Sequence, residues 1–434
     1  MDVQQALDYI YSAKMHGAKK DGLRNITALM DYLGNPQRSY RAVHVTGTNG
    51  KGSICAYCQR MLMAAGYKVG MFISPYIESF NERFQIDEAN IPDDELIACV
   101  ELVKAAVERM VADGRTHPTW FEINTAIGFL YFARQKVDFA VVEVGVGGRL
   151  DCTNILLPEV SVIGSISLDH TKILGDTLEK IAYEKGGIIK PDTPAVWAPQ
   201  QPEAHRRLAQ IAEERHAPCY LASDARVMPK SDTLAGQRFD WVYGERRLAD
   251  LEIRLLGAHQ LENASCAILA MLALSERGVE IPEAAIRSGL AQTRWPGRLE
   301  IMHNDPMVML DGAHNPGAAR VLAQAVRHYF PERPITLVMG MMGDKQVEPV
   351  VELLAPLARR VIVTIPDTFA ARAASLDNLQ ALFARHGQTD VAQQPDPRLA
   401  IDQAMADCPP DGVVLVAGSL YLVGIARTHL RNRA

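Results

Sequence analysis

The chain has 434 residues, which predicts two or three domains and leaves room for a substantial hydrophobic core. Its formal net charge is −6, so the composition offers no basic field to hold nucleic acid and no polybasic segment to hold anionic lipid. Any anionic ligand must therefore be bound by a local site.

The seven cysteines are odd in number and scattered through a chain too large to need disulfide staples, which indicates a reducing compartment. Cys55 and Cys58 form a C-x-x-C pair, but no second pair completes a zinc site, so we expect buried thiols there. The N-terminus lacks a basic segment followed by an apolar one, and the longest uncharged run, 412–426, is short and interrupted by glycine. We therefore expect a cytoplasmic protein without a membrane-spanning segment.

Two short helical patterns, over residues 3–10 and 23–33, precede the first strand. The stretch 43–53, VHVTGTNGKGS, then indicates a strand that runs into a phosphate-binding loop, and an apolar-periodic helix follows over 54–65. Such a loop directs successive backbone N–H groups and the positive end of the next helix at one point, which favours a polyphosphate.

The loop departs from the common G-x-x-x-x-G-K-[ST] pattern. Val45 occupies the first glycine position, and Gly52 separates Lys51 from Ser53. We expect Lys51 to lie against phosphate as a point charge. The alternative is a turn rich in glycine and asparagine that carries an exposed lysine.

After this helix, strands and helices alternate, which predicts an α/β domain with a mainly parallel sheet. Ser74, Glu143 and His170 each follow an apolar run, and the carboxyl ends of parallel strands meet at one edge, so the pattern predicts a single cleft. Residues 218–256 show short alternating segments instead, which indicate a small antiparallel addition. The expected strands are 68–72 and 138–144, and the expected helices are 93–113 and 121–136, with helices resuming from residue 260.

A Trp-Pro-Gly sequence at 295–297 interrupts the helical pattern, and a new strand-helix alternation begins at Leu299. We therefore expect a large phosphate-loop domain over 1–295, a linker over 296–300 and a smaller, doubly wound, Rossmann-like domain over 301–434. The expected strands of the smaller domain are 307–310, 335–339, 361–364 and 413–417.

Several motifs occur in one order over nearly the whole chain. The loop TGTNGKGS at 46–53 resembles that of the Mur ligase superfamily rather than that of kinases or GTPases. Within that superfamily, further segments are similar to those of the folylpolyglutamate synthase family, which includes bifunctional dihydrofolate synthases. These segments are SPYIESFNERF at 74–84, EVGVGGRLDCTN at 143–154, LDHTKILGDTLEKIAYEKGGIIK at 168–190, GAHQLEN at 257–263, WPGRLE at 295–300, LDGAHNP at 310–316 and VAGSLYLVG at 416–424.

The resemblance implies an ATP-dependent ligase that joins L-glutamate to folates, and also to dihydropteroate, through an acyl phosphate, with two Mg²⁺ ions as cofactors. The stretch before the loop is too short for the nucleotide-sugar-binding domain that cell-wall ligases of the superfamily carry there, which favours the folate branch. The alternatives are a monofunctional folylpolyglutamate synthase, another Mur-type amide ligase, or a non-enzymatic nucleotide switch. We expect a monomer with no nucleic-acid or membrane partner.

The resemblance also implies a set of metal ligands. Ser74 and Glu143 are expected to hold the first Mg²⁺, His170 to approach the second, and Lys185 to carry a carbamate that binds metal through its oxygens. A hydroxyl and one carboxylate suffice because Mg²⁺ keeps several waters. The alternatives are a Glu143 paired with Arg149, a capping or core His170, and an ordinary surface Lys185.

The ATP-binding and catalytic residues implied by the resemblance come from both domains. Arg298 in the linker is suited to bridging phosphates. His314 is expected near phosphate or the incoming glutamate, and Ser419 is assigned to the glutamate side. The ATP-binding set is Thr48, Asn49, Gly50, Lys51, Gly52, Ser53, Asn263, Arg298 and Asp311, and the catalytic set is Lys51, Lys185, His170, Arg298 and His314.

For the folate side, the resemblance implies a set of seven residues, and residues 19–25 lie where bifunctional relatives have a pterin-contacting loop. The alternative for these segments is a helix start and a turn. The chain departs from the family pattern at Tyr76, where histidine is usual, at Cys152, where alanine or serine is common, and at Gly186, where alanine is common. The folate-binding set is Arg83, Thr119, Phe121, Glu122, Asp151, Cys152 and Thr153.

Overall fold

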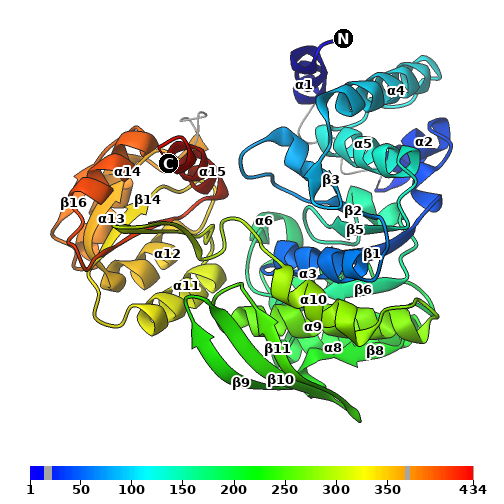
Figure 1. The fold of residues 1–434 in the computed structure, drawn as a ribbon. Helices are drawn as coiled ribbons and strands as arrows, with labels where there is room; N and C mark the ends of the chain where they lie inside the picture. The colour runs from blue at the N-terminus through cyan, green and yellow to red at the C-terminus, as the bar shows by residue number, and fades with distance from the viewer. Residues whose placement is uncertain (14–21, 367–371, 434) are drawn as a thin grey trace.

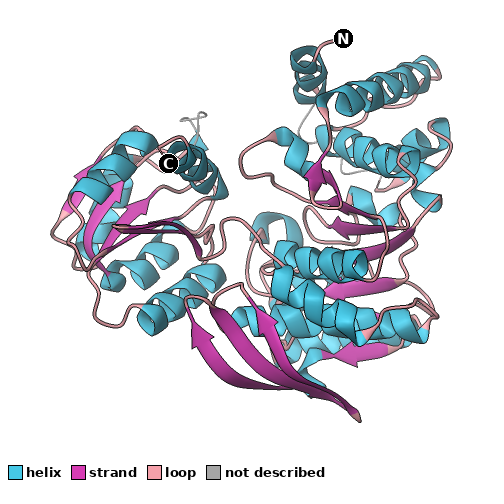
Figure 2. Ribbon diagram, viewed as in Figure 1, coloured by secondary structure: helices cyan, strands magenta, loops and turns pink. Residues whose placement is uncertain are grey.

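The computed structural model describes residues 1–13, 22–366 and 372–433, and it contains two units (Figure 1). Each unit is built on its own β-sheet with helices packed against it (Figure 2). The predicted fold class, α/β with a large and a smaller sheet, is confirmed. The predicted domain boundary falls between helix α10, Glu283–Gln292, and strand β12, Glu300–Asn304.

The large sheet has eight strands in the order β4-β3-β2-β5-β1-β6-β7-β8. Six strands are parallel, whereas β3 and β4 are antiparallel and form one edge. Strands β5 and β6 are buried along their whole length, as a parallel sheet covered by helices requires. The strands are β1 (Arg41–Thr46), β2 (Val69–Phe72), β3 (Phe84–Ile86), β4 (Ala89–Asn90), β5 (Phe139–Glu143), β6 (Val160–Ile163), β7 (Ala195–Trp197) and β8 (Cys219–Leu221).

Separate hydrophobic clusters cover the two faces of this sheet, and the predicted helices are confirmed. Helices α3 (Lys51–Ala64), α9 (His259–Glu276) and α10 belong to one cluster. The other contains α1 (Val3–Ser12), α2 (Arg24–Tyr32), α4 (Asp93–Ala112) and α5 (Trp120–Arg134). A third group, α6 (Thr171–Leu174), α7 (Leu178–Gly186) and α8 (Pro202–Glu214), packs near β7. Within the described ranges, no helix has the length and apolar character needed to cross a membrane.

Three antiparallel strands extend from the large unit (Figure 1). They are β9 (Arg226–Thr233), β10 (Gly236–Tyr243) and β11 (Arg246–Ile253), so the predicted antiparallel addition is confirmed for this part of the chain. The expectation is wrong for β8, which pairs in parallel with β7 and extends the large sheet. Helix α8 returns the chain to that edge, as the helix of a parallel crossover does.

The smaller unit has a six-stranded sheet in the order β12-β13-β17-β14-β15-β16, in which only β12 is antiparallel to its neighbour. Hydrophobic clusters lie on both faces, so the predicted doubly wound architecture is confirmed. The strands after β12 are β13 (Met307–Leu310), β14 (Ile335–Met339), β15 (Ala358–Val363), β16 (Val391–Gln393) and β17 (Val413–Ala417). The helices are α11 (Pro316–Tyr329), α12 (Val347–Leu354), α13 (Leu376–Arg385), α14 (Pro397–Ala406) and α15 (Leu420–Arg431).

Candidate active site

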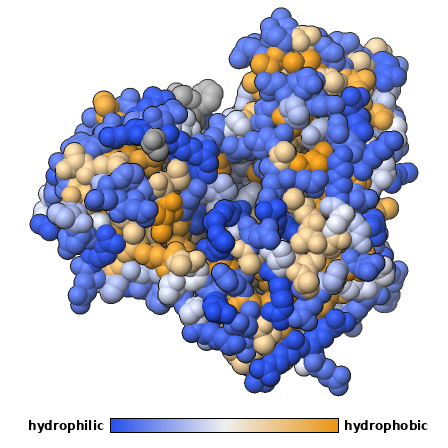
Figure 3. All heavy atoms as spheres, viewed as in Figure 1, coloured by the Kyte–Doolittle hydropathy of each residue, from blue (hydrophilic) through white to orange (hydrophobic). Residues whose placement is uncertain are grey.

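A cavity of about 890 Å³ lies between the two units, where the surface is hollowed (Figure 3). Its walls include the loops that follow β1, β2, β5 and β6, because the carboxyl ends of parallel strands meet at one edge of the sheet. Ser74, Glu143 and His170 all line this cavity, so the structure brings together the residues from which a single cleft was predicted. The linker and loops of the smaller unit form the remaining wall.

Two glycines of the phosphate loop have neighbours that leave no room for a side chain. A Cβ atom on Gly50, whose φ is +84°, would overlap Oδ1 of Asn263. A Cβ atom on Gly52 would lie 2.8 Å from the indole ring of Trp295. The glycine that breaks the common phosphate-loop pattern therefore lets the linker tryptophan pack on the loop, a contact that no sequence motif indicates.

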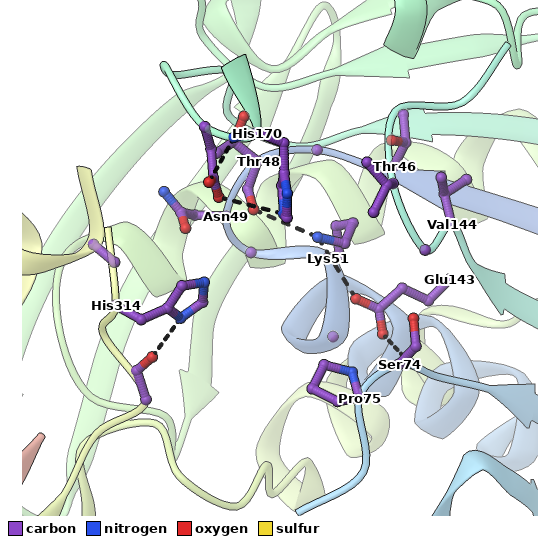
Figure 4. A pocket seen from close by; sticks show the side chains of 18 of the residues that line it. Thr46, Thr48, Asn49, Lys51, Ser74, Pro75, Glu143, Val144, His170 and His314 are labelled. Carbon is purple, nitrogen blue, oxygen red and sulfur yellow. Dashed lines mark hydrogen bonds and ion pairs between the residues drawn. The ribbon is translucent and has the colours of Figure 1, made fainter. Parts of the chain in front are cut away.

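Lys51 and Glu143 form a charged pair in the cavity (Figure 4). Lys51 Nζ lies 3.8 Å from Glu143 Oε1 and 3.4 Å from the carbonyl oxygen of Thr48. The backbone N–H of Ser74 donates to Glu143 Oε2 over 3.2 Å. Burial raises the pKa of Glu143, and the Lys51 ammonium opposes that rise. The alternative pairing of Glu143 with Arg149 is wrong, because Arg149 pairs with a carboxylate of α7 at 2.8 Å.

The pair Ser74 and Glu143 has the donor chemistry of a hydrated magnesium site. Glu143 is only 6% exposed, and its ion pair with Lys51 is long, so its oxygens retain lone pairs for a further cation. Among the residues that the structure describes, no group of three or more His, Cys, Asp or Glu side chains is placed to hold a metal. The site therefore fits a Mg²⁺ bound by one carboxylate, one hydroxyl and waters, and it does not fit an all-protein cage.

His170 lies at the start of α6, on the other side of Lys51 from Glu143 (Figure 4). Its side chain is 36% exposed and makes no capping hydrogen bond, so neither the capping nor the core alternative describes it. Its Nε2 lies 4.0 Å from Oδ2 of Asp169. Burial lowers the pKa of His170, and the Asp169 carboxylate opposes that shift. A neutral imidazole therefore faces the cavity.

Lys185 is buried beneath the phosphate loop, and the alternative of an ordinary surface lysine is wrong. The side chain is 4% exposed, and Nζ donates to the carbonyl oxygen of Gly47 over 2.8 Å. Burial, with the nearby Lys51 charge, lowers the pKa of Lys185 to about 7. A neutral amine is the form that adds CO₂, so this environment suits the predicted carbamate, which stays a prediction.

Gln260 joins two predicted ATP-binding residues. Its Nε2 donates to Ser53 Oγ over 3.2 Å, and its Oε1 accepts from Asn263 Nδ2 over 3.0 Å. All three side chains are buried. The only sequence signal for Gln260 is its position within the GAHQLEN motif.

Asp311 fixes the linker to the loop that follows β13. Its two carboxylate oxygens accept the backbone N–H groups of Leu299, at 3.0 Å, and of Ala313, at 2.9 Å. Burial raises the pKa of Asp311, and the charge of Arg298 opposes that rise. Arg298 itself lines the cavity, as its predicted phosphate contact requires.

His314 has a hydrogen-bond partner at one ring nitrogen and none at the other among the residues that the structure describes. Its Nδ1 donates to the carbonyl oxygen of Gly312 over 2.8 Å, since a carbonyl can only accept (Figure 4). Burial lowers the pKa of His314 to about 4, so the ring is neutral at pH 7 and Nε2 keeps its lone pair. Ser419 also lines the cavity, and its Oγ caps α15 by accepting from the N–H of Tyr421 over 3.2 Å.

Polar side chains connect the two units across the cavity. Asn315 Nδ2 donates to Oδ1 of Asn49 over 3.0 Å and to Oδ2 of Asp169 over 3.2 Å. Lys345 Nζ lies 3.9 Å from Oδ1 of Asp169. The smaller unit therefore contacts the phosphate loop directly, and Lys345 is a cation of the cavity wall that no motif indicates.

Four of the seven predicted folate-binding residues line the cavity. Arg83 is 4% exposed, and its guanidinium carbon lies 4.7 Å from the centre of the Trp120 ring and 5.1 Å from that of Tyr76. Tyr76, which departs from the family pattern, therefore packs on this arginine. The four residues are Arg83, Phe121, Asp151 and Cys152.

The structure does not place Thr119, Glu122 or Thr153 on the cavity wall. Thr119 and Glu122 cap the start of α5 reciprocally, with N–H to oxygen distances of 3.3 Å and 2.7 Å. Thr153 is fully buried, and its hydroxyl donates to Asp151 over 2.5 Å. Glu122 Oε2 also accepts from Asn25 Nδ2 over 3.1 Å. These contacts match the alternative of a helix start and a turn, and a folate contact by these three side chains stays a prediction. Residues 19–21 of the predicted pterin loop lie outside the described residues.

Known proteins resemble the chain over its full length. Residues 45–271 match the Mur ligase middle domain, and residues 297–420 match the Mur ligase glutamate ligase domain. The dihydrofolate synthase/folylpolyglutamate synthase of Bacillus subtilis is 38% identical over 99% of both chains. The Mycobacterium tuberculosis folylpolyglutamate synthase structure complexed with ADP and AMPPCP is 33% identical, with a TM-score of 0.91 over 99% of this chain and 98% of that one. The Escherichia coli FolC structure in complex with DHPP and ADP is 29% identical, with a TM-score of 0.89 over 100% of this chain and 98% of that one.

Proposed function

The chain belongs to the Mur ligase family, in its dihydrofolate synthase/folylpolyglutamate synthase branch, and we propose that it uses ATP to join L-glutamate to folates and to dihydropteroate. The products are the amide, ADP and phosphate. One observation carries the proposal: a single cavity combines a phosphate loop and a buried carboxylate from the large unit with a neutral histidine from the smaller one. The DHPP and ADP bound in the Escherichia coli relative support a pteroate acceptor beside the nucleotide.

The first step activates the carboxylate of the acceptor. A carboxylate oxygen attacks the γ-phosphorus of ATP, the bond from that phosphorus to the bridging oxygen breaks, and ADP leaves an acyl phosphate behind. Because two anions must approach each other, fixed cations and backbone N–H groups are needed at the transferring phosphoryl group. Lys51 and Arg298 provide those charges from the loop and the linker.

Ser74 and Glu143 would hold one Mg²⁺, His170 would approach a second, and a carbamoylated Lys185 would offer further oxygen ligands. The ions would supply positive charge beside the phosphates. The carbamate forms when the neutral amine of Lys185 adds to the carbon of CO₂ and releases a proton. It replaces a buried amine with an anion at the floor of the phosphate loop.

The second step forms the amide bond. The α-amine of glutamate attacks the acyl carbon, a tetrahedral intermediate forms, and the bond from carbon to phosphate oxygen breaks. His314 accepts a hydrogen bond from the amine at Nε2, which orients the nitrogen lone pair at the acyl carbon, and the released phosphate takes up the proton. With a pKa of about 4, His314 positions the amine rather than storing its proton.

A monofunctional folylpolyglutamate synthase is the second candidate. Cys152 lines the cavity, and Tyr76 packs on Arg83, which lines it. Both residues depart from the family pattern, whereas the phosphate side matches it. These two substitutions alter the shape of the wall against which a pterin would pack, so they bear on dihydropteroate more than on ATP.

An assay of ADP release with a panel of folates and with dihydropteroate, each with and without glutamate, tests the proposal. We expect release that requires both an acceptor and glutamate. Release with folates but not with dihydropteroate favours the second candidate. Release that depends on neither acceptor nor glutamate contradicts both.

A further inference from the structure

A loop of the large unit is docked into the core of the smaller unit. The loop covers residues 75–79 after β2, and its Ile77 packs on the smaller unit's hydrophobic cluster that contains Val423. A Cβ atom on Gly424 of α15 would overlap the carbonyl oxygen of Ile77. The helix and the loop are therefore in direct backbone contact, and a residue with a side chain at position 424 would separate them.

Arg427, which lies one turn after Gly424 in α15, binds the same loop through an ion pair. Its side chain is 7% exposed, and it binds Glu300, the first residue of β12, through Nε at 2.8 Å and Nη2 at 3.0 Å. Its Nη1 pairs with Glu78 of the loop. Glu78 also accepts hydrogen bonds from Thr428 Oγ1 at 3.0 Å and from Arg431 Nη1 at 2.9 Å. A buried charge is costly unless it is paired, and Arg427 is paired both with the loop and with the start of β12.

Hydrogen bonds within the loop make it rigid, so a movement at one end of the loop would move the other end. The Glu82 carboxylate accepts the backbone N–H groups of residues 77–79 at 2.7 to 3.1 Å. The loop begins directly after Ser74, whose N–H binds Glu143. If α15 were displaced, the loop would therefore move with it, and the position of Ser74 would change.

Helix α15 also reaches the other side of the cavity. Its capping residue Ser419 and its first residues, Leu420 and Tyr421, line the cavity wall. The same helix thus contacts the proposed glutamate side with its first turn and holds the Ser74 loop through Arg427.

We propose that Arg427 is a positioning residue, which sets the place of Ser74 by holding Glu78 and Glu300 together when the two units are docked. The inference rests on the proposed function for the role of Ser74, but the mechanical link itself does not. The competing explanation is that Arg427 contributes only to the stability of the fold.

Hydrogen exchange of the metal-free protein tests the link without any assay of activity. Arg427→Lys and Glu78→Gln should raise the exchange rates of residues 74–82 while the core strand β5 stays protected. The matched control is Arg385→Gln, because Arg385 pairs at 2.5 Å with Glu348 inside the smaller unit and both side chains are exposed. Unchanged exchange of residues 74–82 in both variants would overturn the proposal.

Kinetics then separate positioning from stability. We expect Arg427→Lys and Glu78→Gln to lower kcat by about tenfold to a hundredfold, since a small misplacement near the reacting groups has costs of that size. The Mg²⁺ concentration for half-maximal rate should rise, and added Mg²⁺ should restore part of the rate. A loss that is equal at all Mg²⁺ concentrations, in proportion to the fall in Tm, would establish a purely structural role. An inactive wild-type protein would count against the proposed function, while the exchange data would still decide the link.

Discussion

Lys185 Nζ lies 2.8 Å from the carbonyl oxygen of Gly47, so a buried lysine supports the phosphate loop from below. Burial lowers the pKa of that lysine to about 7, which leaves a large fraction of the amine neutral at neutral pH. Only the neutral amine can add CO₂, and the site supplies it without a separate base.

We expect enzyme prepared and assayed in CO₂-depleted buffer to lose activity and to regain it when bicarbonate is added. Lys185→Ala should be nearly inactive and partly rescued by short-chain carboxylic acids, because these restore an anion at the vacated place. Electron density at the side chain of a nucleotide-bound crystal provides the direct check. An unmodified ammonium there, in fully active enzyme, would defeat the carbamate prediction.

The same lysine should make stability depend on pH. Its pKa is about 7 in the folded protein against 10.5 for an ordinary lysine, so the unfolded chain binds more protons between these values and stability rises with pH across that window. In CO₂-depleted buffer, Lys185→Met should remove the part of the rise that begins near pH 7. Lys190, whose pKa is lowered to about 8, should still make the stability of the Lys185→Met variant rise with pH above about 8. Denaturant midpoints across the window give the comparison, and identical curves for both proteins would contradict the assignment.

Lys51→Ala should lower the rate of ligation by about a hundredfold or more while leaving the fold intact. Losing one preorganised cation at a transferring phosphoryl group costs about 3 kcal/mol of transition-state stabilisation. The change also leaves Glu143 buried without its partner at 3.8 Å, so the pKa of Glu143 should rise further. Steady-state kinetics with varied ATP, beside a thermal melt, provide the measurement. Near-normal kcat with unchanged ATP dependence would remove this loop from the active site.

Gly52→Ala should disturb the phosphate loop through Trp295 rather than through the nucleotide. The added methyl would lie 2.8 Å from the indole ring, and overpacking of this kind costs about 1 to 3 kcal/mol. Trp295→Leu in the same chain should restore part of the ATP affinity, which isothermal titration can measure. If the second substitution restores nothing, the ring does not explain the glycine.

Asn315→Asp tests whether contact between the units is needed for catalysis. Aspartate can still cap α11, as Asn315 Oδ1 does at 2.9 Å from the N–H of Ala318, but it places a carboxylate where an amide donates to Asp169 at 3.2 Å. We expect repulsion to open the cavity, so small-angle scattering with ATP and folate should show less compaction and ligation should fall. Ser375→Ala, which removes the cap of α13, is the control for lost capping alone. Normal turnover by Asn315→Asp in an open form would show that this contact between the units is not needed for ligation.

The fold was largely predictable because it depends on local periodicity. Strands β13, β14 and β17 lie where runs of apolar residues place them, and the phosphate loop lies between a strand and a helix as its glycines indicate. The sheet membership of β8 was not predictable, because three residues carry no periodic signal and the pairing partner β7 is set by the crossover.

The site residues that belong to a motif could be predicted from the sequence. The residues whose burial or contacts depend on neighbours far away in the sequence could not. The sequence alone does not distinguish a surface Lys185 from a buried one, since its burial comes from helix packing under the loop. Gln260, Trp295 and Lys345 act through distant partners that only the folded chain brings near. Conversely, Thr119 and Glu122 match a motif, but each side chain accepts a hydrogen bond from the backbone of the other at the start of α5.

The contact between Gly52 and Trp295 also limits how relatives of this chain can diverge. One position lies in the phosphate loop and the other in the linker, and position 52 has no room for a side chain while position 295 holds tryptophan. Among homologues, a residue larger than glycine at position 52 should therefore occur together with a smaller residue at position 295. On this view, selection retains Gly52, which looks like part of the nucleotide-binding motif, because the linker tryptophan packs against it.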